Sequence, residues 1–185
     1  MDKKIIAVVG LPGSGKSEVI NYLMKKYNWP KVYFGDVTFD EMKLRGLEIN
    51  EKNERIVRED LRAQFGPLIY AKKVVEKVKA LTEAEDILVE SLYSMDEYLL
   101  FKDEFGDAFK VIAVYASPKT RHSRLTNRPV RPLTNEEAQS RDYSQIKNLS
   151  QAGPISLADY TVMNDKEMEN IYPQIDKIIQ ELDVE

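Results

Sequence analysis

The chain has 185 residues, of which 43% are hydrophobic and 31% are charged, a composition typical of one globular domain with a substantial core. A net charge of −4 argues against broad, sequence-independent binding of nucleic acids, and the absence of cysteine excludes disulfides and thiolate sites. No apolar run is long enough to span a bilayer. We therefore expect a cytoplasmic protein of one domain, residues 1–185, with no nucleic-acid or membrane partner.

The first apolar run, Ile5–Val9, predicts a strand that is buried on both faces of a parallel sheet. An amphipathic helix to about Tyr27 follows it. Between them stands a glycine-rich segment with the P-loop pattern of a glycine, four residues and Gly-Lys-Ser. Strand, loop and helix together favour a phosphate-binding loop over an ordinary glycine-rich turn. We predict that ATP contacts Gly10, Leu11, Pro12, Gly13, Ser14, Gly15, Lys16, Ser17 and Glu18.

The residue types in this loop suit phosphate chemistry. Its glycines allow successive backbone N–H groups to turn inward around a phosphate, and the helix start adds the positive end of its dipole. Lys16 can reach the β- and γ-phosphates as a catalytic point charge, and the Ser17 hydroxyl can hold Mg²⁺. The sequence therefore predicts ATP and Mg²⁺ as cofactors.

A second strand is predicted over Lys31–Phe34, and Gly35-Asp36 ends it. Asp36 then lies at the carboxyl end of a strand, where ligands collect in open α/β sheets, and it is a candidate catalytic residue. A helix N-cap is an equally good interpretation of Asp36, and the two are compatible.

Two or three helices without a strand are predicted between Asp40 and Leu81. Arg55, Arg58 and Arg62 are spaced i, i+3, i+7, which places them along one side of a helix, flanking the apolar stripe of Val57, Leu61 and Phe65. On an open surface these arginines would pair with glutamates of the same helix. We favour a phosphate site in a cleft, because guanidinium groups suit multidentate oxyanion recognition. Residues 37–82 are therefore the expected acceptor-binding insert.

A third strand, Asp86–Ser91, ends in an acid. Glu90 is either a residue that supports Mg²⁺ or a salt-bridged strand terminus. The pattern then predicts a helix over Met95–Phe105, capped by Gly106, and a fourth strand over Lys110–Tyr115.

A second basic row follows the fourth strand. Arg121, Arg124 and Arg128 repeat the i, i+3, i+7 spacing, and Arg131 lies beyond Pro129. The alternatives are a solvated basic helix and a lid, residues 118–150, whose arginines neutralise charge on the transferring group once it closes. We favour the lid, with Arg121 and Arg124 on ATP and with Arg124 and Arg128 as catalytic residues. The single histidine, His122, is expected to be a surface residue without chemistry.

The remaining chain completes an alternating β and α pattern. We expect a polar helix from Thr134 to Leu149 with a Thr134–Glu137 capping box, and a break at Gly153-Pro154. A last strand over Asp159–Asn164 precedes a final helix that Asp165 caps. This order predicts a three-layer α/β P-loop fold, with a parallel sheet of about five strands covered by helices on both faces.

The chain lacks the guanine-recognition and switch motifs of GTPases, and the two arginine rows favour a kinase. It resembles the P-loop nucleoside-monophosphate kinases and dephospho-CoA kinases, especially an adenylate-kinase-related branch. The segments that carry the resemblance are Gly-Leu-Pro-Gly-Ser-Gly-Lys-Ser at 10–17, Phe-Gly-Asp at 34–36, Leu-Arg-Ala-Gln-Phe-Gly-Pro at 61–67, Ala-Ser-Pro-Lys-Thr-Arg at 116–121 and Ala-Asp-Tyr-Thr-Val-Met-Asn at 158–164. The resemblance implies that Lys16 and Ser17 handle the donor phosphates and Mg²⁺, and that Arg124 and Arg128 contact ATP.

One departure concerns the acceptor. After the third strand the related kinases carry an arginine where this chain has Tyr93, so Arg58 and Arg62 would have to hold an acceptor phosphate, with Asp36 and Tyr93 beside it. We expect a monomeric or homodimeric enzyme that moves the γ-phosphate of ATP to a small phosphate- or ribose-containing acceptor, either a nucleoside monophosphate or dephospho-CoA. The alternative is a nucleotide-binding regulatory module without kinase activity.

Overall fold

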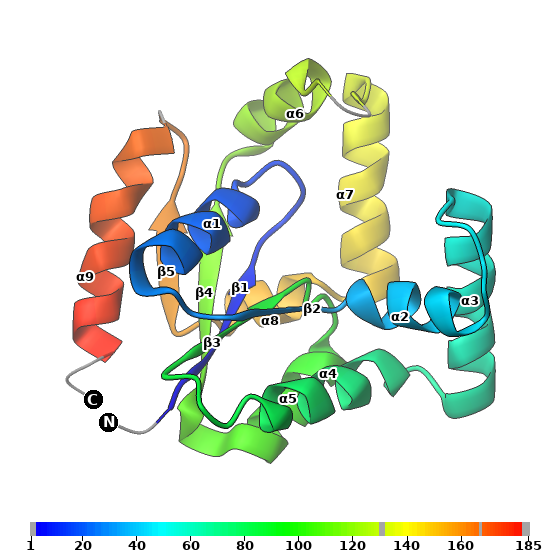
Figure 1. Cartoon of the computed structure of the whole chain (residues 1–185). Helices are drawn as coiled ribbons and strands as arrows, with labels where there is room; N and C mark the ends of the chain where they lie inside the picture. Colours follow the sequence, from blue (N-terminus) through cyan, green and yellow to red (C-terminus); the bar gives the residue numbers. More distant parts are fainter. Residues whose placement is uncertain (1–2, 130–131, 167, 183–185) are drawn as a thin grey trace.

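The computed structural model describes residues 3–129, 132–166 and 168–182. Five strands form one parallel sheet in the order β2-β3-β1-β4-β5 (Figure 1). The predicted α/β fold with a parallel sheet of five strands is confirmed. The strands are β1 (Ile5–Val9), β2 (Lys31–Tyr33), β3 (Ile87–Glu90), β4 (Phe109–Tyr115) and β5 (Tyr160–Met163).

Helices cover both faces of the sheet. On one face α1 and α9 pack together, and on the other α4, α5 and α8 contact the strands (Figure 1). The α-helices are α1 (Lys16–Tyr27), α2 (Asp36–Leu44), α3 (Glu51–Phe65), α4 (Ile69–Ala80), α5 (Met95–Phe105), α6 (Pro118–Asn127), α7 (Asn135–Leu149), α8 (Ala152–Ser156) and α9 (Tyr172–Leu182). Two short 3-10 helices are η1 (Gly106–Ala108) and η2 (Met168–Ile171).

The central strand β1 explains why the sequence begins with a continuous apolar run. Ile6 and Val8 point into the core beneath α1 and α9, whereas Ile5, Ala7 and Val9 point into the core beneath α4 and α5. All five side chains are buried. Each fully buried aliphatic side chain stabilises the fold by roughly 1.5–3 kcal/mol, so β1 is a rigid base for the loop that follows it.

Because all five strands are parallel, their carboxyl ends meet at one edge of the sheet. The loops that follow β1, β2, β3 and β4 therefore converge, and ligands of open α/β sheets bind at such an edge. The P-loop, the start of α2, the segment from Ser91 to Ser94 and the start of α6 all lie there. The three helices α2, α3 and α4 between β2 and β3 agree with the prediction for this stretch.

Four local predictions need comment. The capping box of Thr134 and Glu137 is confirmed, and Gly106 ends α5 with a φ of 54°. The other two were wrong. Asp165 does not cap the last helix: it accepts hydrogen bonds from Ser117 at the start of α6, because the loop after β5 lies beside that helix end. Gly153 lies inside the short helix α8, whose five residues the break prediction missed.

One further prediction concerns the end of α3. Phe65 was expected on the inner stripe of its helix but is 58% exposed, because α3 ends there and Gly66 turns the chain away from the core.

Within the described residues, no helix combines the length and the apolar character needed to cross a bilayer.

Candidate functional site

The P-loop wraps tightly between β1 and α1. Gly13 has a φ of 79°, and a Cβ there would lie 2.6 Å from the carbonyl oxygen of Arg121, so only glycine fits this position. The Ser14 N–H donates to the Leu11 carbonyl at 3.2 Å, which closes the turn, and Gly15 begins α1 with a φ of 101°. The loop thus presents the N-terminus of α1 toward the centre of the sheet edge, as an anion site requires.

Lys16 is the cation of this loop. Its ammonium donates only to the Leu11 carbonyl, at 3.2 Å, and has no ion pair within the described residues. The pKa of Lys16 is lowered to about 8, mainly by burial; the charge of Glu90 opposes this shift, and the charges of Arg141 and Arg121 add to it. A buried ammonium without an anionic partner fits the negative charge of a phosphate chain.

Glu90 and Ser17 were predicted on the metal side. The Glu90 carboxylate accepts a hydrogen bond from Lys31 at 2.7 Å, so the interpretation as a salt-bridged strand end is realised, and its charge also acts on Lys16. Ser17 is exposed in the first turn of α1. Within the part of the chain that the structure describes, no three His, Cys, Asp or Glu side chains are grouped to hold a metal ion.

Arg121 has a different position from that of a free lid arginine. It is 3% exposed, donates from Nη1 and Nη2 to the two carboxylate oxygens of Asp142 at 2.7 and 2.8 Å, and donates to the Ala116 and Pro12 carbonyls. His122 shares the same carboxylate at 2.8 Å and is only 17% exposed, so its prediction as a surface residue was wrong. These contacts fix α7 against α6 and against the P-loop.

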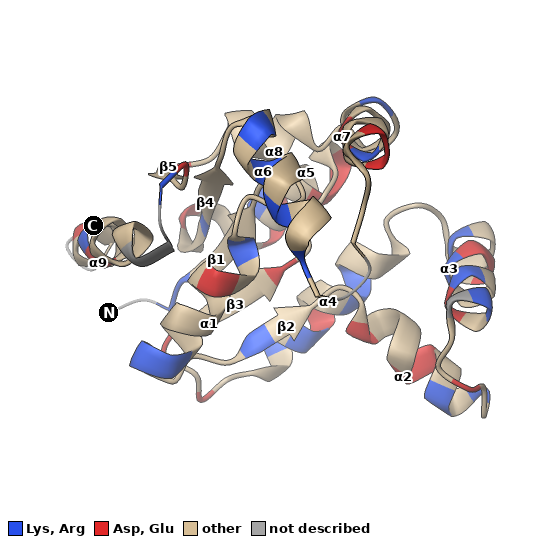
Figure 2. Ribbon diagram, turned by 90° about the horizontal axis from the view of Figure 1, so that it is seen from above, with Lys and Arg blue, Asp and Glu red and all other residues tan. Residues whose placement is uncertain are grey.

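The other lid arginines have separate environments. Arg124 donates from Nη2 to Asn164 and to the Lys166 carbonyl, at 3.3 and 3.1 Å, and its Nη1 is buried without a partner. Arg128 ends α6, and Arg131 lies outside the described residues. Figure 2 shows Lys and Arg gathered on α6, whereas α3 carries charges of both signs. The three arginines predicted to form one row therefore differ: Arg121 is buried in an ion pair, whereas Arg124 and Arg128 lie at the outer part of the helix.

A pocket of about 200 Å³ lies at the same carboxyl edge of the sheet as the P-loop, between the ends of β2 and β3 and the helices α2, α3, α4 and α5. Arg58 and Arg62 line it, but Arg55 does not and is exposed. Only two of the three predicted arginines are thus brought together, because the i+3 and i+7 positions face the pocket and the first faces solvent.

The two pocket arginines are held differently. Arg58 is paired with Glu54 at 3.3 Å. The guanidinium carbon of Arg62 lies 4.9 Å from the centre of the Tyr70 ring, and Arg62 makes no ion pair within the described residues. Tyr70 is fixed in turn, because its hydroxyl is hydrogen-bonded to Thr38 at 2.8 Å. Arg62 therefore keeps its donors for a ligand while its plane rests on a rigid ring.

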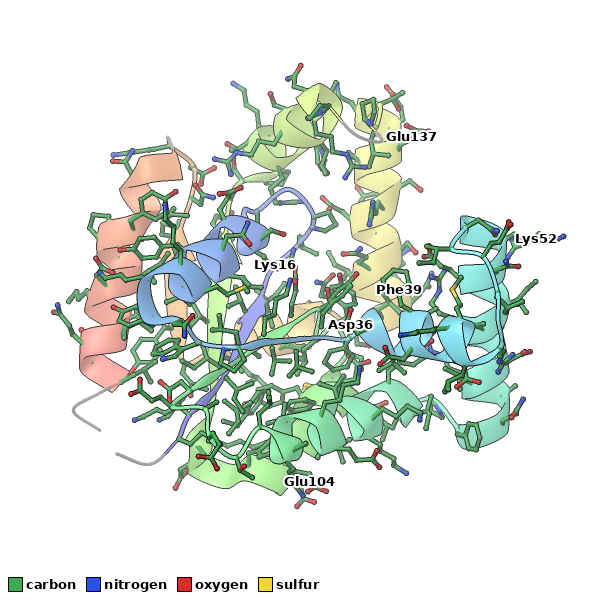
Figure 3. All side chains as sticks on the ribbon, viewed as in Figure 1. Lys16, Asp36, Phe39, Lys52, Glu104 and Glu137 are labelled. Carbon is green, nitrogen blue, oxygen red and sulfur yellow. The ribbon has the colours of Figure 1, made fainter. Side chains whose placement is uncertain are left out.

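Asp36 is the first residue of α2, and its side chain makes no capping bond, since Gly35 is the N-cap. Figure 3 shows Asp36 at the start of α2 and Lys16 at the start of α1, both at the carboxyl edge of the sheet. The Tyr33 ring packs directly over Gly35. Burial first, and then Tyr93 and the carboxylates of Glu90 and Asp36, raise the pKa of Tyr33, so these groups lie close together.

Tyr93 lines the pocket at the end of β3. Its hydroxyl is hydrogen-bonded to Ser91 at 2.9 Å. Ser91 is buried with a φ of 74°, a conformation that costs a serine free energy and that clusters at functional sites. The strained backbone at the end of β3 thus accompanies a tyrosine, and not a cation, on this wall of the pocket.

A second chamber of about 230 Å³ adjoins the first and shares Arg62 and Glu97 with it. Its other walls are the α3–α4 corner, the first turn of α5 and the last residues of α7. Burial raises the pKa of Glu97, although the N–H groups of Tyr93 and Ser94 and the charge of Arg62 oppose this. Arg62 stands between the two chambers.

The comparison with known proteins decides the family. A UPF0200 protein from Thermococcus kodakarensis is 32% identical to this chain over 182 residues, covering 96% of this chain and 97% of that protein. The chain belongs to the UPF0200 family. A family profile described as an AAA domain also matches residues 6–142.

Solved structures place the fold of this UPF0200 chain. Shikimate kinase from Bacteroides thetaiotaomicron has a TM-score of 0.60 at 14% identity, covering 97% of this chain and 98% of that chain. A gluconokinase from Sinorhizobium meliloti 1021 has a TM-score of 0.59 at 14% identity, covering 97% and 95%. At this identity the likeness concerns the fold alone, which is the P-loop kinase-like fold.

Several site residues of this UPF0200 chain were missed from the sequence. Arg141 lies on α7 within the predicted lid, and its charge reaches Lys16 from there. Tyr33, Tyr70 and Glu97 carry no motif, and their roles depend on packing between separate helices and strands. Of these three residues, only Tyr33 stands at the end of a strand, a position that Tyr115 shares at the end of β4.

Proposed function

We propose that this protein transfers the γ-phosphoryl group of a nucleoside triphosphate, ATP by preference, to a small acceptor. The observation that carries the proposal is a P-loop whose ammonium has no anionic partner within the described residues, together with a pocket at the same edge of the sheet that is lined by two arginines. An acceptor oxygen attacks the γ-phosphorus, the bond from that phosphorus to the bridging oxygen breaks, and ADP leaves with the electron pair.

The P-loop is the proposed donor site. Its backbone N–H groups and Lys16 would hold the β- and γ-phosphates, and the developing charge would be spread over the same donors in the transition state. Ser17 would hold Mg²⁺, which binds through few protein oxygens and completes its shell with phosphate and water, and Glu90, whose charge acts on Lys16, would support it. Magnesium would there neutralise charge on the phosphate oxygens.

The lid is the second part of the donor site. Arg124 and Arg128 lie on the outer part of α6, and Arg141 faces Lys16 from α7. Arg124 would have to exchange its partners in the loop after β5 for phosphate oxygens, which closure of residues 118–150 would permit. Arg121 instead keeps the lid in register with the P-loop and does not contact ATP in this proposal.

The pocket with Arg58 and Arg62 is the proposed acceptor site. Its two guanidinium groups suit a phosphate, and the rings of Tyr33 and Tyr93 provide flat walls for a base or a ribose. Asp36, next to Tyr33, is placed to accept a proton if the acceptor group is a hydroxyl. A nucleoside monophosphate would use the first chamber, whereas dephospho-CoA would also need the second chamber for its arm.

An acceptor screen tests this function. Purified protein with ATP and Mg²⁺ is incubated with nucleoside monophosphates, dephospho-CoA and small hydroxylated acids, and ADP and phosphorylated product are measured by chromatography. We expect one acceptor class to stimulate ADP release with equal formation of product, and Lys16→Ala to abolish it. Arg55→Ala is the matched control for Arg62→Ala, because both arginines lie on α3 but only Arg62 lines the pocket.

Tyr93 at the acceptor pocket favours a second candidate, a nucleotide-binding regulatory module that does not transfer phosphate. ATP binding without any acceptor-stimulated turnover, together with a protein partner that is captured only when ATP is present, would support that function. Capture that is equal with and without nucleotide would exclude it. Acceptor-dependent product would decide for the kinase.

A further inference from the structure

Three side chains from the second half of the chain donate hydrogen bonds to alternate carbonyl groups of the P-loop. Gln151 Nε2 donates to the Gly10 carbonyl at 3.0 Å, Arg121 Nη1 to the Pro12 carbonyl at 3.2 Å, and Asn164 Nδ2 to the Ser14 carbonyl at 2.7 Å. The donors come from three different elements: α6, the N-cap of α8 and the residue after β5. All three side chains belong to residues that are at most 3% exposed.

These contacts leave the inner side of the loop free. The N–H groups of Gly13, Gly15 and Lys16 donate to no backbone or side-chain group of the described residues. Converging N–H dipoles around a buried ammonium repel one another when no anion is bound. A peptide that rotates its carbonyl inward would relieve that repulsion, and would also block the phosphate site.

We propose that Gln151, Arg121 and Asn164 are positioning residues that hold the P-loop in its phosphate-binding conformation by fixing these three carbonyl groups outward. This inference rests on the proposed binding of a nucleoside triphosphate. The donors act through the loop backbone and touch no reacting atom. Because they belong to α6, the α7–α8 junction and β5, the shape of the anion site depends on how the lid and the carboxyl-terminal strand are packed.

Gln151 is the most suitable of the three residues for a test, because its replacement breaks no ion pair. Its side chain is fully buried, and Nε2 makes the contact while Oε1 has no hydrogen-bond partner. Its position follows from Ser150, whose φ of 52° ends α7 and turns the chain beneath the P-loop. Replacing Arg121 would instead leave Asp142 uncompensated and unfold part of the lid. Gln174 is the control, since it also bridges backbone groups, around β5 and η2, but donates to no P-loop carbonyl within the described residues.

The experiment measures the affinities for Mg²⁺-ATP and for inorganic triphosphate by calorimetry, on variants that circular dichroism shows to be folded. We expect Gln151→Met to weaken both ligands by the same factor, on the order of tenfold, because a lost hydrogen bond raises the free energy of the competent loop. Gln174→Met should bind both ligands like the wild type. Equal factors are expected because the loop holds the phosphates and not the base.

The pH dependence of ligand affinity in Gln151→Glu distinguishes a hydrogen-bonding role of Gln151 from a merely structural one. A carboxylate cannot donate to the Gly10 carbonyl, but a protonated carboxyl can. Relative to the wild type, the affinity of Gln151→Glu should therefore recover as the pH falls from 7 to 5, while the ratio for Gln151→Met stays constant. Wild-type affinity in Gln151→Met overturns the inference. If the wild type itself binds neither ligand, the proposed function fails instead.

Discussion

Replacing Asp142 by asparagine removes a charge from a buried ion pair and leaves nearly the same shape. Arg121 contacts both carboxylate oxygens, at 2.7 and 2.8 Å, and the two side chains are 4% and 9% exposed. At a charge separation of about 4 Å and an effective dielectric constant of about 20, the attraction is about 4 kcal/mol. Asparagine keeps one acceptor for the guanidinium, so we expect the free energy of unfolding to fall by about 3 kcal/mol.

Urea unfolding at pH 7, followed by circular dichroism, measures this change as a lower midpoint at an unchanged m-value. Asp60→Asn is the control, because Asp60 also pairs with an arginine, Arg45, at 2.7 Å, but is 44% exposed. The substitution and the shortest distance are the same, but the Asp60 pair is exposed and has one contact instead of two, so the control should barely move the midpoint. Similar small shifts in both variants would refute the argument from burial.

The pH dependence of stability checks the same pair. Burial raises the pKa of Asp142, but the hydrogen bonds and charges of Arg121 and His122 outweigh it and hold the pKa below its ordinary value of 3.8. The folded chain therefore binds fewer protons than the unfolded chain at acid pH. The stability that Asp142 contributes is present above pH 3.8 and is lost as the pH falls through the lower pKa that Asp142 has in the folded chain. Wild type and Asp142→Asn should converge in stability there. A constant difference would contradict the assignment.

Three other outcomes follow from the site. Because the pKa of Lys16 is lowered to about 8, the free protein loses this charge above pH 8. Calorimetry should show that the affinity for ATP falls about tenfold by pH 9 and that binding at pH 8 takes up protons. Lys16→Arg should show neither effect. Arg62→Lys should raise the KM of the acceptor about tenfold at an unchanged KM for ATP, since an ammonium neither stacks on Tyr70 nor binds a phosphate bidentately; an equal rise for both substrates would place Arg62 elsewhere in the reaction. Gly13→Ala should abolish ATP binding and lower the unfolding free energy by about 1–3 kcal/mol, because the added Cβ would lie 2.6 Å from the Arg121 carbonyl oxygen. Wild-type binding in that variant would contradict the loop geometry.

The local part of the site was predictable because its information is local. A buried strand, a glycine pattern and an amphipathic helix lie within about twenty residues, and they specify the P-loop without reference to the rest of the chain. The arginine rows were half predictable. Helical spacing showed that the three arginines of α3 share a side, but not that the pocket includes Arg58 and Arg62 and leaves Arg55 in solvent.

Alternating strands and helices, the P-loop and the Thr134–Glu137 capping box were determined by the sequence, since each depends on periodicity or on neighbours a few residues away. Only the tertiary structure decided that Arg121 is buried against Asp142, that His122 joins them, and that Gln151 reaches the Gly10 carbonyl. These contacts join positions between 20 and 141 residues apart. They depend on the crossing of helices and on chain reversals such as the one at Ser150, and no periodic pattern encodes which distant side chain a given helix face will meet.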